Sequence, residues 1–278
     1  RDLVRSRGLG DVYKRQNLEI MKKNLFSIFL FVLLSFSNYS SAQSQAVLVN
    51  ETLTYDVIYK WGFINKVAGY ATMSLRDEGD CYKATVYAEN APWANSIYML
   101  RDTLYTTFTK VGLYPLEYTY IAHEAGKYKK DVLEFSHNGD VFTANVQRFK
   151  QSSPKEPVVK STKHLEANGM TVDMLSAFFY LRSLDFDNMS NGQSVTVNIF
   201  SGSKKEKLRI TYLGRSQITL NKKNFDTYHI NFTFTRNGKV SSDPISGWMS
   251  ADSQRIPLKV EGSLAVGKVK AIYTGPNP

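Results

Sequence analysis

The chain has few of the residues that build disulfides, metal centres and nucleophilic active sites. Its 278 residues include one cysteine and four histidines. Cys81 has no partner for an internal disulfide, so the fold must be stabilised by burial of apolar surface. The histidines His123, His137, His164 and His229 are isolated in the sequence, without the short ligand spacing of zinc sites. We therefore expect no metal-binding residue.

Catalytic motifs are lacking as well. The sequence contains no Gly-x-Ser-x-Gly nucleophile turn and no phosphate-binding glycine loop, and no pair of carboxylates stands out. Cys81 follows the turn residues Gly79 and Asp80 and has no basic partner nearby, so we interpret it as the start of a strand and not as a nucleophile. We expect a protein that is not an enzyme, with no catalytic residue, no cofactor-binding residue and no cofactor.

The chain also lacks an apolar run of the about 20 residues that a transmembrane helix needs. Its apolar segment Leu25–Phe36 has 12 residues, follows Lys22 and Lys23, and precedes Ser40-Ser41-Ala42. A basic start, a short apolar core and small residues before the cleavage site are typical of a secretory signal peptide. We predict that residues 21–42 are a cleaved signal peptide. No cysteine follows the apolar core, so we expect no lipid anchor. We expect a periplasmic protein that does not span the membrane, and we leave open whether it associates with the outer membrane.

Residues 1–20 begin with Arg1 and precede a leader that has its own Met21. We interpret them as a non-native extension and exclude them from fold reasoning. Residues 43–278 are expected to form a single β-rich domain. Seven basic and three acidic residues lie before residue 43, so the net charge of +10 falls to about +6 for this domain.

A modest basic excess suits anionic lipid or glycan headgroups, and it is equally typical of an ordinary soluble basic protein. The basic residues are scattered along an exported chain, so we expect no nucleic-acid partner. A lipid or another envelope component is the partner that we consider. The sequence does not predict an oligomeric state.

Strand signals fill most of the domain. The 17 Tyr and 16 Phe suit half-buried pleated surfaces. Leu53–Tyr59 alternates apolar and polar side chains, which is the period of a strand, and Asn138-Gly139 is a strong hairpin signal. About fourteen strands are expected. They are 53–59, 67–75, 81–88, 102–110, 114–123, 127–135, 141–149, 195–200, 206–213, 216–220, 226–235, 245–251, 257–264 and 267–273.

Two segments break the alternation. Residues 91–100 carry Pro92 near their start, which suits a short helix. Residues 171–184 have an apolar helical stripe, with Thr171 as the expected cap. Residues 151–160 read as a long loop. The fold class is therefore mainly β: a single large antiparallel curved sheet or partly open β-barrel with one or two packed helices.

Two groups of polar residues can each be interpreted either as a functional site or as a set of structural contacts. Asp173, Ser176 and Tyr180 share one face of the second helix, and Arg182 lies on another face. This group is either a polar handle for a ligand carboxylate or phosphate, or an acid at the helix start plus an arginine that ties down a neighbouring loop. We favour the structural interpretation.

The second group follows a strand near the C-terminus. Trp248, Ser250 and Asp252 point to one side, and Asp252 suits the first position of a turn that leads through Arg255 to Pro257. Interpreted as a functional site, this group is an aromatic wall with polar residues at its edge. Interpreted as a structural feature, it is a well-specified hairpin, and we favour this interpretation.

Four features follow one another along the chain: a Leu-x-Tyr opening strand, Gly62 with Ala68-Gly69, the Asp173-x-Leu-Ser helix ending in Leu181-Arg182, and the Trp248-x-Ser-x-Asp hairpin with Ile256-Pro257. In this order they resemble the bacterial domain-of-unknown-function 3108 family. The resemblance covers roughly residues 50–275. It implies an exported, β-rich envelope protein and no particular chemistry.

We expect a non-catalytic envelope protein whose curled sheet binds an apolar or lipid-like ligand. The alternatives are an outer-membrane β-barrel, a glycan-binding module and an envelope hydrolase. The hydrolase would need a cleft with convergent carboxylates or a Ser–His pair, and pairing of His229 or His123 with a buried acid would favour it. Whether the inside of the sheet is solid or hollow discriminates best among these functions.

Overall fold

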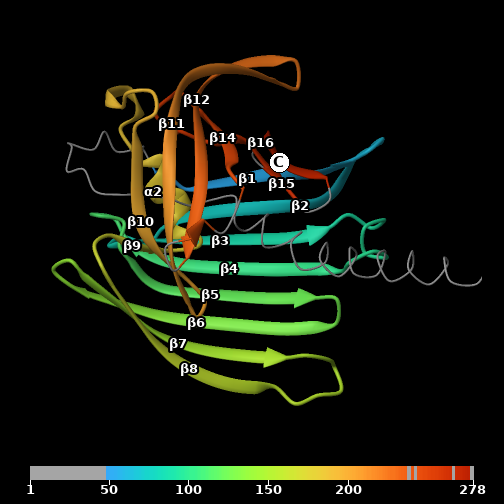
Figure 1. Ribbon diagram of the computed structural model, residues 1–278, viewed down its shortest axis with the longest axis vertical. Coiled ribbons are helices and arrows are strands. Elements are labelled where there is room, and N and C mark those ends of the chain that lie inside the picture. The colour runs from blue at the N-terminus through green and yellow to red at the C-terminus, as the bar shows by residue number, and fades with distance from the viewer. Residues whose placement is uncertain (1–47, 237–238, 241–242, 265–266, 276–278) are drawn as a thin grey trace, which may run out of the picture.

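The computed structural model describes residues 48–236, 239–240, 243–264 and 267–275, so the predicted extension (1–20) and signal peptide (21–42) lie outside the described residues. Sixteen strands form one sheet (Figure 1). Their bounds are β1 Glu51–Trp61, β2 Ile64–Asp77, β3 Cys81–Asn90, β4 Leu100–Thr109, β5 Pro115–Glu124, β6 Lys127–Asn138, β7 Val141–Gln151, β8 Val159–Asn168, β9 Thr171–Asp173, β10 Ser194–Ser201, β11 Lys204–Leu220, β12 Lys223–Arg236, β13 Lys239–Val240, β14 Ile245–Ser250, β15 Pro257–Ser263 and β16 Lys268–Gly275.

The sheet runs from β8 back to β1, then through β16, β15, β14, β12, β11 and β10 to β9. Pairing of β1 with β16 joins the N-terminal and C-terminal halves, and all the pairs are antiparallel except β9 with β10. In Figure 1, β2–β8 lie across the molecule, whereas β10–β12 rise steeply against them. The sheet is thus strongly curved and nearly closed, which confirms the predicted fold class.

The gap between β8 and the β10–β11 hairpin is bridged by side chains. Lys163 Nζ donates to the Ser203 carbonyl at 2.9 Å, and Lys205 Nζ donates to the Glu166 carbonyl at 2.8 Å. Asn198 Nδ2 donates to the Asn168 carbonyl at 2.8 Å. We call these three contacts the seam. Because they replace a strand ladder, the barrel is partly open along this line.

One face of the curved sheet builds the core. Along β4 every second residue is buried, from Leu100 to Phe108. Helix α2 (Ser176–Arg182) packs against β4 and β9, inside the curve of the sheet, and a short 3-10 helix, η1 (Phe186–Asn188), follows it. Phe179 is fully buried and stacks on Phe108 with ring centroids 5.1 Å apart. Burial of such a side chain is worth roughly 1.5–3 kcal/mol.

Both predicted helices differ in the structure. Residues 91–100 form a series of turns, held by Trp93 Nε1 donating to the Val67 carbonyl at 2.6 Å, so the predicted helix there was wrong. The second helix begins later than predicted. Thr171 to Asp173 form β9, because they pair in parallel with Asn198–Phe200 of β10. The cap prediction for Thr171 was therefore wrong too.

Two strand predictions also need correction. The polar stretch 159–168 forms strand β8, which pairs only with β7 and is mostly exposed. Its lack of an apolar alternation is explained by its edge position. Residues 206–220 belong to one strand, β11, with a register shift between Tyr212 and Gly214. Gly214 has φ 107°, a conformation that favours glycine, so it bends the strand and does not end it.

No helix in the described part of the chain is long and apolar enough to cross a membrane.

Candidate functional site

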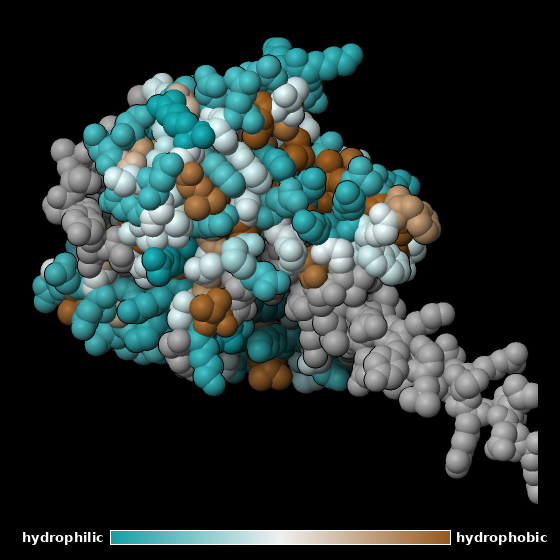
Figure 2. Space-filling model, turned by 45° about the horizontal axis from the view of Figure 1, so that its top comes forward, coloured by the Kyte–Doolittle hydropathy of each residue, from teal (hydrophilic) through white to brown (hydrophobic). Residues whose placement is uncertain are grey.

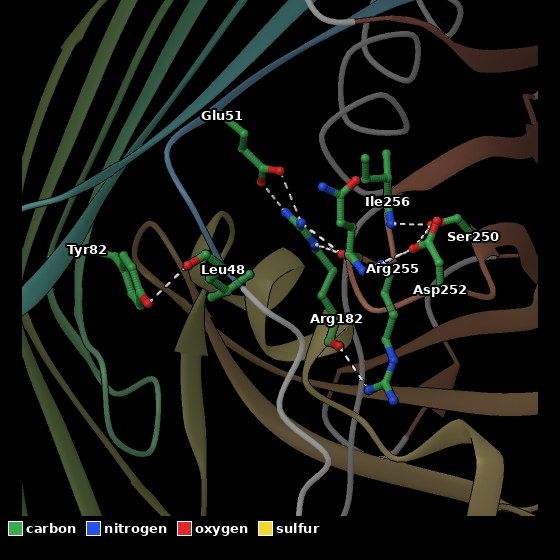
Figure 3. A network of polar contacts seen from close by, with 9 residues as sticks. Leu48, Glu51, Tyr82, Arg182, Ser250, Asp252, Arg255 and Ile256 are labelled. Atoms are coloured by element: carbon green, nitrogen blue, oxygen red, sulfur yellow. Dashed lines mark hydrogen bonds and ion pairs between the residues drawn. The ribbon is translucent and has the colours of Figure 1, made fainter.

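Arg182 of the first polar group and the turn at Asp252 of the second lie together in the structure. Arg182, at the end of α2, has no exposed surface, and its guanidinium pairs with the Glu51 carboxylate of β1. Its Nε and Nη2 also donate to the Gln254 carbonyl in the β14–β15 loop, at 3.0 and 2.9 Å. Figure 3 shows Arg182 between Glu51 and this loop. The prediction that Arg182 ties down a neighbouring loop is confirmed.

The β14–β15 loop is itself tightly bonded. Asp252 Oδ1 accepts the backbone N–H groups of Gln254 and Arg255, each at 3.0 Å, and the Ser250 hydroxyl at 2.8 Å. Arg255 is buried and donates to the carbonyl of Arg182 (Figure 3) and to that of Leu184. The predicted turn at Asp252 is confirmed. We call Glu51, Arg182, Asp252 and Arg255 with the Gln254 carbonyl the Arg182 network.

Asp173 ends β9 and is not part of α2, so the prediction that it shares a helix face with Ser176 and Tyr180 was wrong, but its carboxylate holds the start of the helix. Its Oδ1 accepts the backbone N–H groups of Leu175 at 2.7 Å and Ser176 at 2.8 Å, and its Oδ2 accepts the Thr106 hydroxyl at 2.7 Å. Burial raises the pKa of this carboxyl, although all these hydrogen bonds favour its ionised form. These contacts are structural, as are those of the Arg182 network.

A second set of polar side chains points into the sheet from β4 to β7. Asp102 of β4 occupies an inward position between Leu100 and Leu104 and is completely buried. The Tyr120 hydroxyl donates to Asp102 Oδ2 at 2.7 Å and contacts Glu124 Oε1 at 3.3 Å. Burial, with a smaller contribution from the Glu124 charge, raises the pKa of Asp102 to about 8, although the Tyr120 hydrogen bond acts to lower it.

Next to this pair lies an ion cluster on β6 and β7. Asp131, fully buried, accepts two bonds from Arg148, at 2.6 and 3.0 Å, and lies 2.8 Å from Lys129 Nζ. Burial alone would raise the pKa of Asp131, but Arg148 and Lys129 outweigh burial and hold it below the ordinary value. The β10–β11 turn lies against this pair, since a Cβ on Gly202 would meet Asp131 Oδ2 at 2.3 Å. We call Asp102, Tyr120, Glu124, Lys129, Asp131 and Arg148 the charged cluster.

The charged cluster borders two neighbouring cavities. The larger has a volume of about 400 Å³ and lies along β7, β8 and the loop between them. The smaller, about 220 Å³, lies over the ends of β5 and β6, and both are lined by Lys150 and Ser152. We call the two together the basic groove. Its charged lining residues are Lys127, Lys129, Arg148, Lys150 and Lys163, with Glu124 and Glu156.

The inside of the sheet is solid near α2. Phe108, Phe178, Phe179 and the residues around them form one continuous apolar core. An apolar cavity between β1, β2, β3 and β16 has a volume of about 40 Å³, which holds a water molecule or two but not an acyl chain. The larger cavities therefore lie at the charged side of the interior.

The histidines and the cysteine occupy structural positions. His229 stacks on Trp248 with ring centroids 4.6 Å apart, and the tilted rings of His123 and Tyr128 lie 5.2 Å apart. His137 contacts the rings of Tyr114 and Phe142. His164 Nδ1 lies 2.9 Å from Asn145 Oδ1. Cys81 opens β3, as predicted, and is a free cysteine. Within the described ranges, no group of three or more His, Cys, Asp or Glu residues could hold a metal ion.

Sequence reasoning missed the charged cluster. A signal was present, because Asp102, Asp131 and Arg148 occupy the same alternation phase as Leu104, Leu133 and Val146. Charged residues in an inward phase are unusual and mark a site or a buried ion pair. The Tyr120 hydroxyl lies between the two carboxylates of Asp102 and Glu124 and is within hydrogen-bond distance of both.

The fold has relatives among solved structures. A β-barrel-like protein of the DUF1849 domain family from Brucella abortus aligns with a TM-score of 0.59 and 8% sequence identity, over 83% of this chain and 98% of that one. A candidate exported protein with a YmcC-like fold from Bacteroides fragilis aligns with a TM-score of 0.32 at 8% identity, over 88% and 100% of the two chains. At so low a score, only the Brucella protein supports the shared fold.

Among curated proteins, none matches this sequence. A family model does match, over residues 54–274, and it is described as a protein of unknown function, DUF3108. The match spans the sheet from β1 to β16, including α2 and both polar groups that carried the resemblance. The chain therefore belongs to the DUF3108 family.

Proposed function

We propose that this protein is an exported, non-catalytic envelope protein that binds an acidic, lipid-like ligand in the basic groove. The observation that carries the proposal is the lining of the groove, where five cationic side chains meet two acidic ones beside a cavity of about 400 Å³. A volume in this range is ordinary for a small-molecule site. The signal-peptide pattern predicted for residues 21–42 supports export.

The chemistry of the groove favours a ligand with an anionic head and an apolar part. Arg148 and Lys150 lie on the inward phase of β7, and Lys163 lies opposite on β8, where it pairs with Val146. A carboxylate or phosphate between these groups would receive charge-assisted hydrogen bonds. Val146, Pro157 and Val159 line the same cavity and offer an apolar contact.

The non-catalytic part of the proposal is supported by the contacts of the titratable groups. Asp131 is held by Arg148 and Lys129, and Asp102 is held by Tyr120. A general acid or base must reach a substrate atom. Both carboxylates are completely buried, so neither is placed for that role.

A fluorescent dansyl-labelled fatty acid tests the proposal by titration of the protein purified after export. We expect saturable binding, and a decrease in affinity of about tenfold when Lys150→Gln and Lys163→Gln remove two charge-assisted contacts. The matched control is Lys207→Gln, an exposed lysine on the outward phase of β11. Equal affinity in the wild type, the double variant and the control would contradict the proposed site.

A further inference from the structure

One end of the curved sheet forms a continuous rim. Four connections follow one another there, and Figure 1 shows them at the right. They are the β1–β2 turn, residues 91–99, the β5–β6 turn and the β7–β8 loop. The Ala125 N–H donates to the Met99 carbonyl at 2.9 Å, and a Cβ on Gly126 would lie 4.0 Å from Pro154 Cδ. We call residues 60–66, 91–99, 125–127 and 152–160, with Lys268, the rim.

Large apolar side chains stand exposed along this rim. Phe63 is 100% exposed and Trp61 is 53% exposed, on either side of Gly62 in the β1–β2 turn. Further along the rim, the exposed apolar residues are Ile97, Met99, Val158 and Val159. In Figure 2, hydrophobic atoms lie at the right-hand end, where the β1–β2 turn and the 91–99 segment lie. An exposed tryptophan and phenylalanine at one hairpin tip mark an interaction surface.

Lysines flank the same tip. Lys60 stands directly opposite Lys268 in the β1–β16 ladder, and both are exposed. Like charges placed opposite each other destabilise a strand pair, and the Glu261 carboxylate, 3.8 Å from Lys268 Nζ, offsets part of this repulsion. Lys66 lies on the other side of the turn, 4.8 Å from the Trp93 ring centroid. The acids near the rim are engaged in part, since Glu124 accepts the Tyr98 hydroxyl and Glu89 lies 3.9 Å from Arg101.

We propose that the rim docks on an anionic lipid bilayer, with Trp61 and Phe63 inserted at the interface and Lys60, Lys66 and Lys268 over the headgroups. Aromatic rings prefer the headgroup level of a membrane. The repulsion between Lys60 and Lys268 is relieved at a negative surface, where each lysine strengthens binding about fivefold. The basic groove is lined by Ser152, Glu156, Pro157 and Val159 of the same rim, so its mouth would face the bilayer.

Vesicle flotation with the exported, processed protein tests the docking. We expect binding to vesicles that contain phosphatidylglycerol and much weaker binding to vesicles of phosphatidylcholine alone. Trp61→Ser with Phe63→Ser should weaken binding at least about tenfold, because two aromatic side chains no longer leave water. Val111→Ser is the matched control, since Val111 is 82% exposed in the β4–β5 turn at the opposite end of the sheet.

A second variant keeps the test valid if the aromatic substitutions disturb the hairpin. Lys60→Gln with Lys268→Gln removes two charges, along with the exposed contact between Lys268 and Glu261, and should weaken vesicle binding by roughly twentyfold or more without unfolding the strand pair. Unchanged flotation in both variants would overturn the proposal. So would a wild-type protein that ignores anionic vesicles but self-associates through Trp61 and Phe63, which sedimentation of the same variants would reveal.

Discussion

The two sides of the interior differ in what surrounds their buried charged residues. Near α2, the buried Arg182 meets the Glu51 carboxylate and a loop carbonyl, and solid apolar packing surrounds them. Near β5–β8, Asp131 and Arg148 also pair, but a cavity of about 400 Å³ lies beside them and lysines line it. Buried charge holds elements together at both sides, but only at the second does a cavity with exposed lysines lie beside it, which is where we propose the ligand binds.

Removal of the partner of Arg182 should have the largest effect on stability. Glu51→Ala leaves a fully buried guanidinium without its carboxylate, so the free energy of unfolding should fall by about 3–5 kcal/mol. The matched control is Glu89→Ala, which breaks the exposed contact with Arg101 and should cost less than about 1 kcal/mol. Urea denaturation measures both. Equal losses would show that the Arg182 network is no more structural than a surface ion pair.

The next effect is a pH dependence from Asp102. Its pKa is about 8 in the folded state, above the ordinary value in the unfolded chain, so the folded state binds one more proton between these two values. Stability should therefore fall as the pH rises from about 4 to 8, by roughly 1 kcal/mol per pH unit. Asp102→Asn keeps an acceptor for Tyr120 and should remove this slope. Denaturation of both proteins at pH 5 and pH 8 tests this; parallel changes would contradict it.

Substitutions in the basic groove should change binding more than stability. Lys150 and Lys163 are exposed, so the Lys150→Gln and Lys163→Gln variant should lose less than about 1 kcal/mol of unfolding free energy. The same variant should lose about tenfold in fatty-acid affinity. If its stability falls as far as that of Glu51→Ala, the two sides do not differ as we describe.

The smallest expected effect concerns the seam. Lys205→Ala removes the hydrogen bond to the Glu166 carbonyl and should cost about 0.5–1 kcal/mol. Because β8 pairs only with β7, the loss should be local and should speed hydrogen exchange in β8. Lys207→Ala, two residues along β11 and outside the seam, is the control. Identical exchange in the two variants would show that the seam does not close the barrel.

The alternation of residues predicted the mainly β fold well, because an inward apolar face repeats every second residue in strands such as β4. Strand β8 was not predicted because it lies at the edge of the sheet and is mostly exposed, so its residues do not alternate between apolar and polar. The start of α2 was misplaced because residues 171–173 pair with β10, a contact that only the folded chain provides.

The functional residues were only partly predictable. The sequence identified Asp173, Arg182, Asp252 and Arg255, and the structure explains all four as structural residues. Lysines 150 and 163 look like ordinary surface residues in the sequence. Their meeting depends on the curvature of the sheet and on the fold of the β7–β8 loop, which no local pattern encodes.

The most direct measurement is mass spectrometry of the organic extract of the protein purified from the periplasm. We predict that an acidic lipid or fatty acid co-purifies in near-stoichiometric amount with the wild type and with Lys207→Gln, and is depleted from the Lys150→Gln and Lys163→Gln variant. Extracts that contain no acidic lipid, or the same amount in all three proteins, would contradict a ligand-binding role for the charged side of the sheet.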